Sequence, residues 1–103
     1  GPPVQTVPPR GIGAFFRDKK GLKAVIVPAC DLEKYRRKNY SVPGSTGRIS
    51  KTRINLLTVY ESKGLEFSCV AVADAHMNDH ERYIAYTRAL KELAVIREAD
   101  DEN

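Results

Sequence analysis

The residues best suited to chemistry in this 103-residue chain lie in a short polar segment, residues 58–67, between two apolar runs. Within it, Gly64 carries no side chain, so the backbone at that position can approach a ligand closely. Glu66 offers a carboxylate that can accept hydrogen bonds from sugar hydroxyl groups. From the residues alone, however, a surface salt bridge between Lys63 and Glu66 explains these two charges more simply.

A second segment of chemical interest surrounds Arg88, in residues 83–93. A guanidinium group can neutralise the charge that develops on a phosphoryl group during its transfer, a role worth roughly 10³- to 10⁵-fold in rate. An arginine on the surface of a helix is the more usual interpretation of such a residue. The residue type therefore permits phosphate chemistry without requiring it.

Metal ligation receives little support from the spacing of the metal-binding residue types. His76 and His80 are four residues apart, with Cys69 seven residues before His76, but structural zinc sites need four well-placed ligands. The acidic run 100–102 follows a final short strand and precedes only Asn103 in the sequence, so we interpret it as part of a tail. We predict no metal site.

Two kinds of catalytic machinery are missing from the sequence. No Gly-x-x-x-x-Gly-Lys-[Ser/Thr] pattern occurs, so the chain has no loop that could cradle the phosphates of a nucleotide. Thr58, Ser62 and Ser68 lack convincing base and acid partners for a hydrolase triad. We therefore expect no complete active site within these residues.

Composition and charge indicate a folded and mildly basic domain. The sequence is 42% hydrophobic and 29% charged, which argues against a disordered chain. Its net charge of +4 permits contact with nucleic acid. Cys30 and Cys69 adjoin apolar runs, which fits reduced, buried thiols in a cytoplasmic protein. No apolar stretch approaches the ~20 residues of a membrane span.

The pattern of apolar residues predicts which elements position these groups. We expect strands at 4–7, 23–28, 54–60, 68–73 and 93–96 and helices at 11–19, 31–39 and 78–91, with N-caps at Asp31 and Asn78. Alternating strands and helices predict an α/β fold of three layers, α/β/α, with a mostly parallel sheet of about five strands. We expect one domain, 1–103, with an extended lead-in at 1–10, a loop at 41–53 and an acidic tail at 97–103.

Two segments resemble motifs of the UvrD/Rep-type superfamily 1 DNA helicases. Residues 57–67, with Lys63-Gly64-Leu65-Glu66-Phe67 after a strand and a threonine, resemble motif V. Residues 83–93, with Tyr-x-Ala-x-Thr-Arg-Ala at 83–89, resemble motif VI. The resemblance is close over residues 54–96, whereas residues 4–39 match the rest of that family's second RecA-like domain only in outline. It implies the C-terminal part of the second RecA-like domain of such a helicase, a P-loop NTPase fold without its P-loop.

The resemblance also implies roles for individual residues. Gly64, Glu66 and Arg88 would bind ATP, Glu66 facing the ribose and Arg88 acting catalytically on the γ-phosphate. Ligands of open α/β sheets bind beyond the carboxyl ends of the strands, so we expect Glu66 and Arg88 together at that edge. ATP and Mg²⁺ would be held only in the intact motor, against a first RecA-like domain from the same or another chain.

The expected nucleic-acid-binding residues are Thr58, Tyr60 and Lys63, and we predict weak binding of single-stranded DNA. The family commonly has His where Tyr60 stands. This departure, together with a short 73–79 segment, favours a rival: a non-enzymatic, helicase-like module that binds nucleic acid or a protein partner. A third, weaker alternative is a small phosphate-binding α/β domain of unrelated function.

Overall fold

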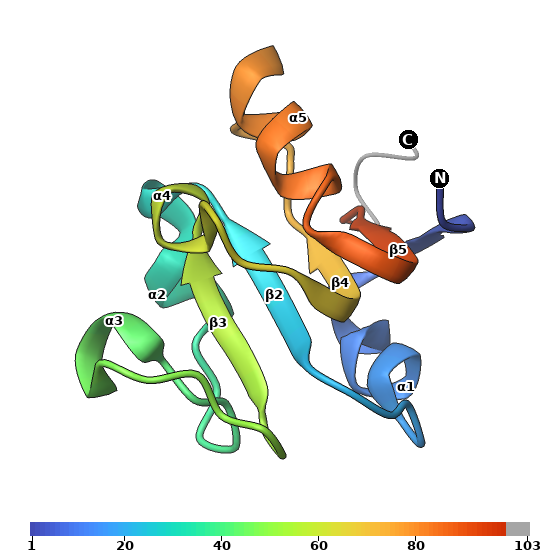
Figure 1. The fold of residues 1–103 in the computed structure, drawn as a ribbon. Coiled ribbons are helices and arrows are strands. Elements are labelled where there is room, and N and C mark those ends of the chain that lie inside the picture. The colour runs from blue at the N-terminus through green and yellow to red at the C-terminus, as the bar shows by residue number, and fades with distance from the viewer. Residues whose placement is uncertain (99–103) are drawn as a thin grey trace.

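A five-stranded parallel sheet forms the centre of the molecule in the computed structural model, which describes residues 1–98 (Figure 1). The strands lie in the order β1-β5-β4-β2-β3, and each neighbouring pair is parallel. Their bounds are β1 Val4–Val7, β2 Lys23–Val27, β3 Ile54–Thr58, β4 Phe67–Val72 and β5 Ala89–Ile96. The predicted fold class is confirmed.

Burial explains why these segments take these places in the sheet. Strands β2 and β4 are almost wholly buried apolar runs, as expected for strands covered on both faces. In β1, by contrast, only Val7 is buried. Prolines at positions 2, 3, 8 and 9 flank that strand, and proline is tolerated beside edge strands.

Helices cover both faces of the sheet and bury alternate residues of each strand. Helices α1 (Ile12–Phe16) and α2 (Leu32–Tyr35) pack on the face to which Val25 and Val27 point. Helices α4 (Val59–Ser62) and α5 (Asp79–Tyr86) pack on the opposite face, with Ala24 and Ile26. Two short 3-10 helices, η1 (Pro9–Gly11) and η2 (Ala29–Asp31), precede α1 and α2, and α3 (Pro43–Thr46) lies before β3. The three predicted layers are therefore present.

Several predicted bounds are wrong in the first half of the chain. The expected helix at 31–39 ends at Tyr35, and the Asp31 side chain does not cap it. Residues 36–39 are charged or polar and exposed, so a longer helix would bury nothing against the sheet. The loop 41–53 contains α3, and the helix expected at 11–19 ends at Phe16, whereas β1 confirms the strand expected at 4–7 within the lead-in 1–10.

Two further bounds differ around the motif-like segments. Strand β3 ends at Thr58, because Thr58 and Glu61 form a capping box that begins α4, and Tyr60 therefore lies in a helix. The Asn78–Glu81 capping box forms as predicted, but α5 ends at Tyr86 and residues 89–91 belong to β5. Leu90 and Lys91 are exposed, but Ala89 is buried and pairs with Phe67 in the ladder between β4 and β5, and this pairing overrides the helical propensity of Ala-Leu-Lys.

The expected tail is described only at Arg97 and Glu98, which are both half-buried, and the acidic run 100–102 lies outside the described residues. Within residues 1–98, no helix is long and apolar enough to cross a membrane.

Candidate functional site

Glu66 and Arg88 lie at the same edge of the sheet, each immediately before a strand. Phe67 and Ala89 are paired in the ladder between β4 and β5, and the Phe67 N–H donates to the Arg88 carbonyl at 2.9 Å. This is the amino-terminal edge, so the expectation of the carboxyl edge was wrong. Because β3 and β4 both run in the same direction, residues 59–66 must travel back along the sheet before β4 can begin.

The Arg88 side chain joins the two motif-like segments. Its Nε donates to the Ile84 carbonyl at 3.1 Å, and Nη1 donates to the Leu65 carbonyl at 3.1 Å. Nη2 donates to Thr87 Oγ1 at 3.1 Å. A guanidinium has five N–H donors, so these bonds leave donors for a further acceptor. No carboxylate within residues 1–98 forms an ion pair with Arg88, so its charge is available to an anion.

Glu66 is exposed and has no hydrogen bond or ion pair with any side chain of residues 1–98. The salt bridge with Lys63 does not form; instead the Lys63 ammonium lies over the Tyr60 ring, 4.8 Å from its centroid. Gly64 has a φ of +79° and no atom within 4 Å of the position a Cβ would occupy. Glycine is thus needed here for its left-handed backbone, and the space above it is open.

Thr58, Tyr60 and Lys63 gather at the other end of the sheet, where β3 runs into α4. Thr58 Oγ1 accepts the Glu61 N–H at 3.3 Å, and Glu61 Oε1 accepts the Thr58 N–H at 2.8 Å. Tyr60 is 70% exposed, which leaves its ring free to stack. The length of β4, roughly 17 Å at the usual rise per residue, separates Thr58 from Glu66 and Arg88. Lys63 is only three residues before Glu66 and lies on the connection between the two ends.

A buried carboxylate that the sequence pattern did not single out anchors the motif VI-like helix. Asp74 is 2% exposed and accepts hydrogen bonds from the Tyr86 hydroxyl and from Arg97. Arg82 donates to the Asp74 carbonyl at 3.3 Å. Burial, and then the bond to Asp74, raise the pKa of the Tyr86 hydroxyl. The sequence signal that could have identified this carboxylate was its position, directly after the apolar run 70–73.

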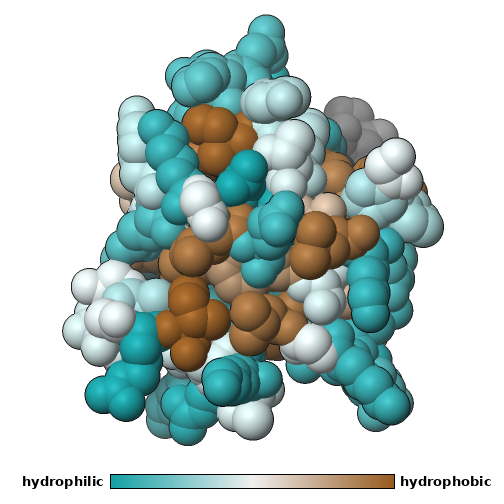
Figure 2. All heavy atoms as spheres, in the orientation of Figure 1, coloured by the Kyte–Doolittle hydropathy of each residue, from teal (hydrophilic) through white to brown (hydrophobic). Residues whose placement is uncertain are grey.

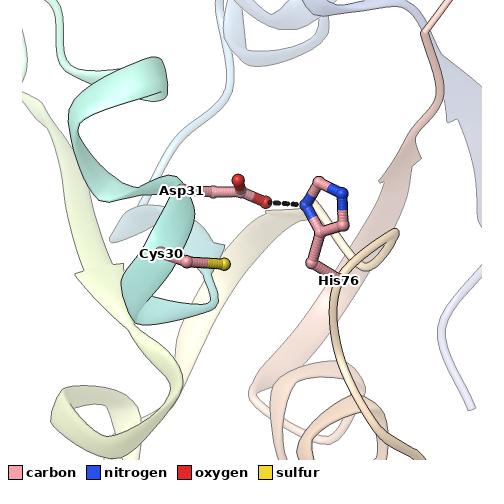
Figure 3. A group of neighbouring side chains, drawn as sticks. All are labelled: Cys30, Asp31 and His76. Atoms are coloured by element: carbon pink, nitrogen blue, oxygen red, sulfur yellow. Dashed lines mark hydrogen bonds and ion pairs between the residues drawn. The ribbon is translucent and has the colours of Figure 1, made fainter.

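The structure also brings together Cys30, Asp31 and His76, whose ligand atoms lie within 4.8 Å of one another (Figure 3). The trio considered from spacing, Cys69, His76 and His80, is not brought together. Cys69 is buried in the core on the α1 side of the sheet, and His80 is not part of the cluster. Cys30 is exposed, so the expectation that both thiols are buried is wrong for this residue.

The fold is similar to that of the C-terminal domain of a possible DNA helicase from Lactobacillus plantarum WCFS1. The two structures superpose with a TM-score of 0.66 over 94% of this chain and 73% of that one, at 20% sequence identity. An identity this low shows a shared fold and leaves the activity open. No protein-family model matches the chain, and no match was found among curated proteins.

Beside the motif V-like segment, one face of the molecule carries a central apolar patch surrounded by polar residues. Figure 2 shows apolar residues gathered over the middle of that face. Partly buried hydrophobic side chains packed against the core on this side are Leu22, Ile49, Leu65, Ile84 and Tyr86. An adjoining pocket of about 320 Å³ is lined by Pro43, Gly44, Gly47, Arg48, Ile49, Leu57, Glu61 and Leu65. Apolar patches of this kind often mark protein interfaces.

Proposed function

We propose that this chain is the C-terminal RecA-like domain of a cytoplasmic, ATP-dependent DNA helicase of the UvrD/Rep type. It supplies one wall of the ATP site, with Gly64, Glu66 and Arg88, and part of a track for single-stranded DNA. ATP and Mg²⁺ are held against a first RecA-like domain from the same or another chain, and that domain provides the phosphate loop. The isolated chain does not hydrolyse ATP.

The observation that carries this proposal is the junction between the two motif-like segments. Arg88 donates to the Leu65 carbonyl and its own carbonyl accepts from Phe67, so the positions of Glu66 and Arg88 are set by one another. An exposed carboxylate and a cation with no acidic partner among residues 1–98 suit the ribose and the γ-phosphate of one nucleotide. The likeness to a possible DNA helicase domain supports the same assignment.

The apolar face next to this junction suits contact with the first RecA-like domain. Leu65 and Ile84 lie within the segments that resemble motifs V and VI, and both are only partly buried. Closing a second domain over them removes apolar area from water. The same closure brings the phosphates of ATP towards Arg88.

One observation favours the rival, a nucleic-acid-binding module without ATPase activity. Tyr60 is one of the most exposed large hydrophobic residues within residues 1–98, and the Lys63 ammonium lies over its ring. An exposed aromatic ring beside a cation is an arrangement that binds single strands by stacking on bases. The two hypotheses differ in how binding should respond to salt.

We expect the isolated chain to bind single-stranded DNA weakly and mainly through phosphates. Log affinity should then fall with log salt concentration with a slope of about −0.7 per neutralised phosphate. Lys63→Ala should make that slope less steep by about 0.7, the contribution of one phosphate contact. Fluorescence anisotropy of a labelled oligonucleotide over a series of salt concentrations measures both quantities.

Two exposed residues away from this surface serve as matched controls. Lys20→Ala and Tyr83→Ala should leave affinity and slope nearly unchanged, since both side chains are exposed and lie outside residues 58–63, Lys20 between α1 and β2 and Tyr83 in α5. Tight binding that resists salt and is lost in Tyr60→Ala would indicate base stacking and support the rival module.

Glu66→Ala should raise the Michaelis constant for ATP in the intact helicase more than it lowers turnover. A ribose contact acts in the ground state and the transition state alike, so its loss weakens both equally. Asp79→Asn removes another exposed carboxylate, whose surface pair with Arg82 is worth little, and should change neither constant. A fall in turnover with an unchanged Michaelis constant would contradict the ribose role of Glu66.

A further inference from the structure

We propose that Cys30, Asp31 and His76 form a binding site for a divalent transition-metal ion of the Zn²⁺ type, with at least one coordination position open. This site is separate from the residues assigned to ATP and DNA above, and it does not depend on that assignment. It rests on three observations: the three ligand atoms that lie together, the burial of the Asp31 carboxylate, and the position of the cluster at the carboxyl ends of two neighbouring strands.

The geometry brings three different donor atoms to one point. His76 Nδ1 lies 2.9 Å from Asp31 Oδ2, and the Cys30 sulfur lies within 4.8 Å of both side chains' ligand atoms. In Figure 3 the cysteine and aspartate side chains extend from one segment towards the imidazole of the other. Zinc bonds of about 2.0–2.3 Å place neighbouring ligand atoms roughly 3.3–3.7 Å apart. Small side-chain adjustments therefore suffice to enclose an ion.

The Asp31 carboxylate is largely buried, and its partner is an exposed histidine. Its side chain is 12% exposed, and its only hydrogen bond to a side chain within residues 1–98 is the one with His76. A buried carboxylate is costly unless it is paired or coordinates a metal. His76 is 60% exposed and Cys30 is exposed, so an ion can reach the cluster from solvent.

The cluster lies where open parallel sheets commonly bind ligands. Cys30 and Asp31 follow the carboxyl end of β2, and His76 follows that of β4, the neighbouring strand. The chain leaves β2 towards α2 on one face and leaves β4 towards α5 on the other. Ligands of open α/β sheets bind in the crevice at such a switch point. A pocket of about 190 Å³, lined in part by Asp31, Ala73 and His76, adjoins it.

The donor set selects the class of metal. A thiolate and an imidazole favour zinc-like ions, whereas Ca²⁺ and Mg²⁺ prefer oxygen ligands only. Three protein ligands leave a fourth position of a tetrahedral site to water or to a small anionic ligand, which is how zinc sites that are not purely structural are built.

Titration of the purified, reduced chain with Zn²⁺ and with Co²⁺ tests the proposal. Calorimetry should give one Zn²⁺ per chain, and Co²⁺ should produce the absorption bands of a tetrahedral ion with a thiolate ligand. Cys30→Ser and His76→Ala should each weaken binding by more than the roughly 10- to 100-fold typical of losing an outer-shell partner. Both side chains are exposed, so neither variant should unfold the domain.

His80→Ala is the matched control, because His80 is an exposed histidine four residues from His76 and outside the cluster. It should bind Zn²⁺ with wild-type affinity. Absence of stoichiometric binding by the wild-type chain would overturn the proposal. Binding that survives Cys30→Ser or His76→Ala, or that falls equally in His80→Ala, would also overturn it.

Discussion

Arg88→Ala should lower the ATPase turnover of the intact helicase by roughly 10³- to 10⁵-fold, the range for an arginine that acts on a transferring phosphoryl group. ATP binding should be largely retained, because the charge that Arg88 stabilises develops only during transfer. Single-turnover hydrolysis and equilibrium binding of a fluorescent ATP analogue separate these two effects. The isolated chain, which lacks a phosphate loop, should release no phosphate in either form.

The hydrogen bonds of Arg88 make a stability measurement part of this experiment. The surface position expected from sequence implied almost no effect on folding, but the structure gives Arg88 bonds to the Ile84 and Leu65 carbonyls. Their loss should cost about 1–3 kcal/mol of unfolding free energy. Phe67→Leu is a suitable control, since it removes core packing next to Arg88 and leaves the guanidinium in place. It should keep its ATPase activity.

If Arg88→Ala and Glu66→Ala both leave the ATPase activity of the intact protein unchanged, the motifs reflect ancestry without mechanism. The nucleic-acid-binding module would then be the better hypothesis.

Phe67→Ala should cost about 3–5 kcal/mol of unfolding free energy, the usual range for removing a buried aromatic ring. Phe67 is 1% exposed and packs with Val70, Ala85 and Leu93 on the α5 side of the sheet. The total free energy of unfolding of a small domain is only about 5–15 kcal/mol. Urea denaturation of the isolated chain, followed by circular dichroism, measures the difference.

Tyr83→Ala removes another large aromatic residue of a motif-like segment, but its side chain is 68% exposed. Its effect should stay within about 0.5 kcal/mol. A similar cost for both variants would mean that Phe67 does not pack as described. The last residue of the motif V-like segment therefore stabilises the core, whereas Glu66 beside it is free to contact a ligand.

The sequence pattern predicted most elements, because long apolar runs such as 24–27 have few alternatives to a buried strand. It failed where tertiary contacts decided the outcome. Residues 89–91 favour a helix, but pairing of Ala89 with Phe67 places them in β5. Glu66 was assigned to the carboxyl edge because it follows β3, although it directly precedes β4.

The Cys30–Asp31–His76 cluster was beyond prediction for a related reason. Asp31 and His76 are 45 positions apart, and their contact depends on β4 lying beside β2. Hydrophobic periodicity gives the number of strands but leaves their order open. The side chains that meet at a sheet edge therefore emerge only once the order is known.

The strand order has a consequence for how the sheet can be assembled during synthesis. Among the strands of residues 1–98, β1 is made first, yet the strand with which it pairs there is β5, which is made last of the five. β2 and β3 can pair early and β4 can then add to β2, but β1 must wait until some ninety further residues have been made. Closing so long a loop is entropically unfavourable and slow. Val4–Val7 therefore stays unpaired in the nascent domain until β5 has been made, which exposes it to mispairing with other chains.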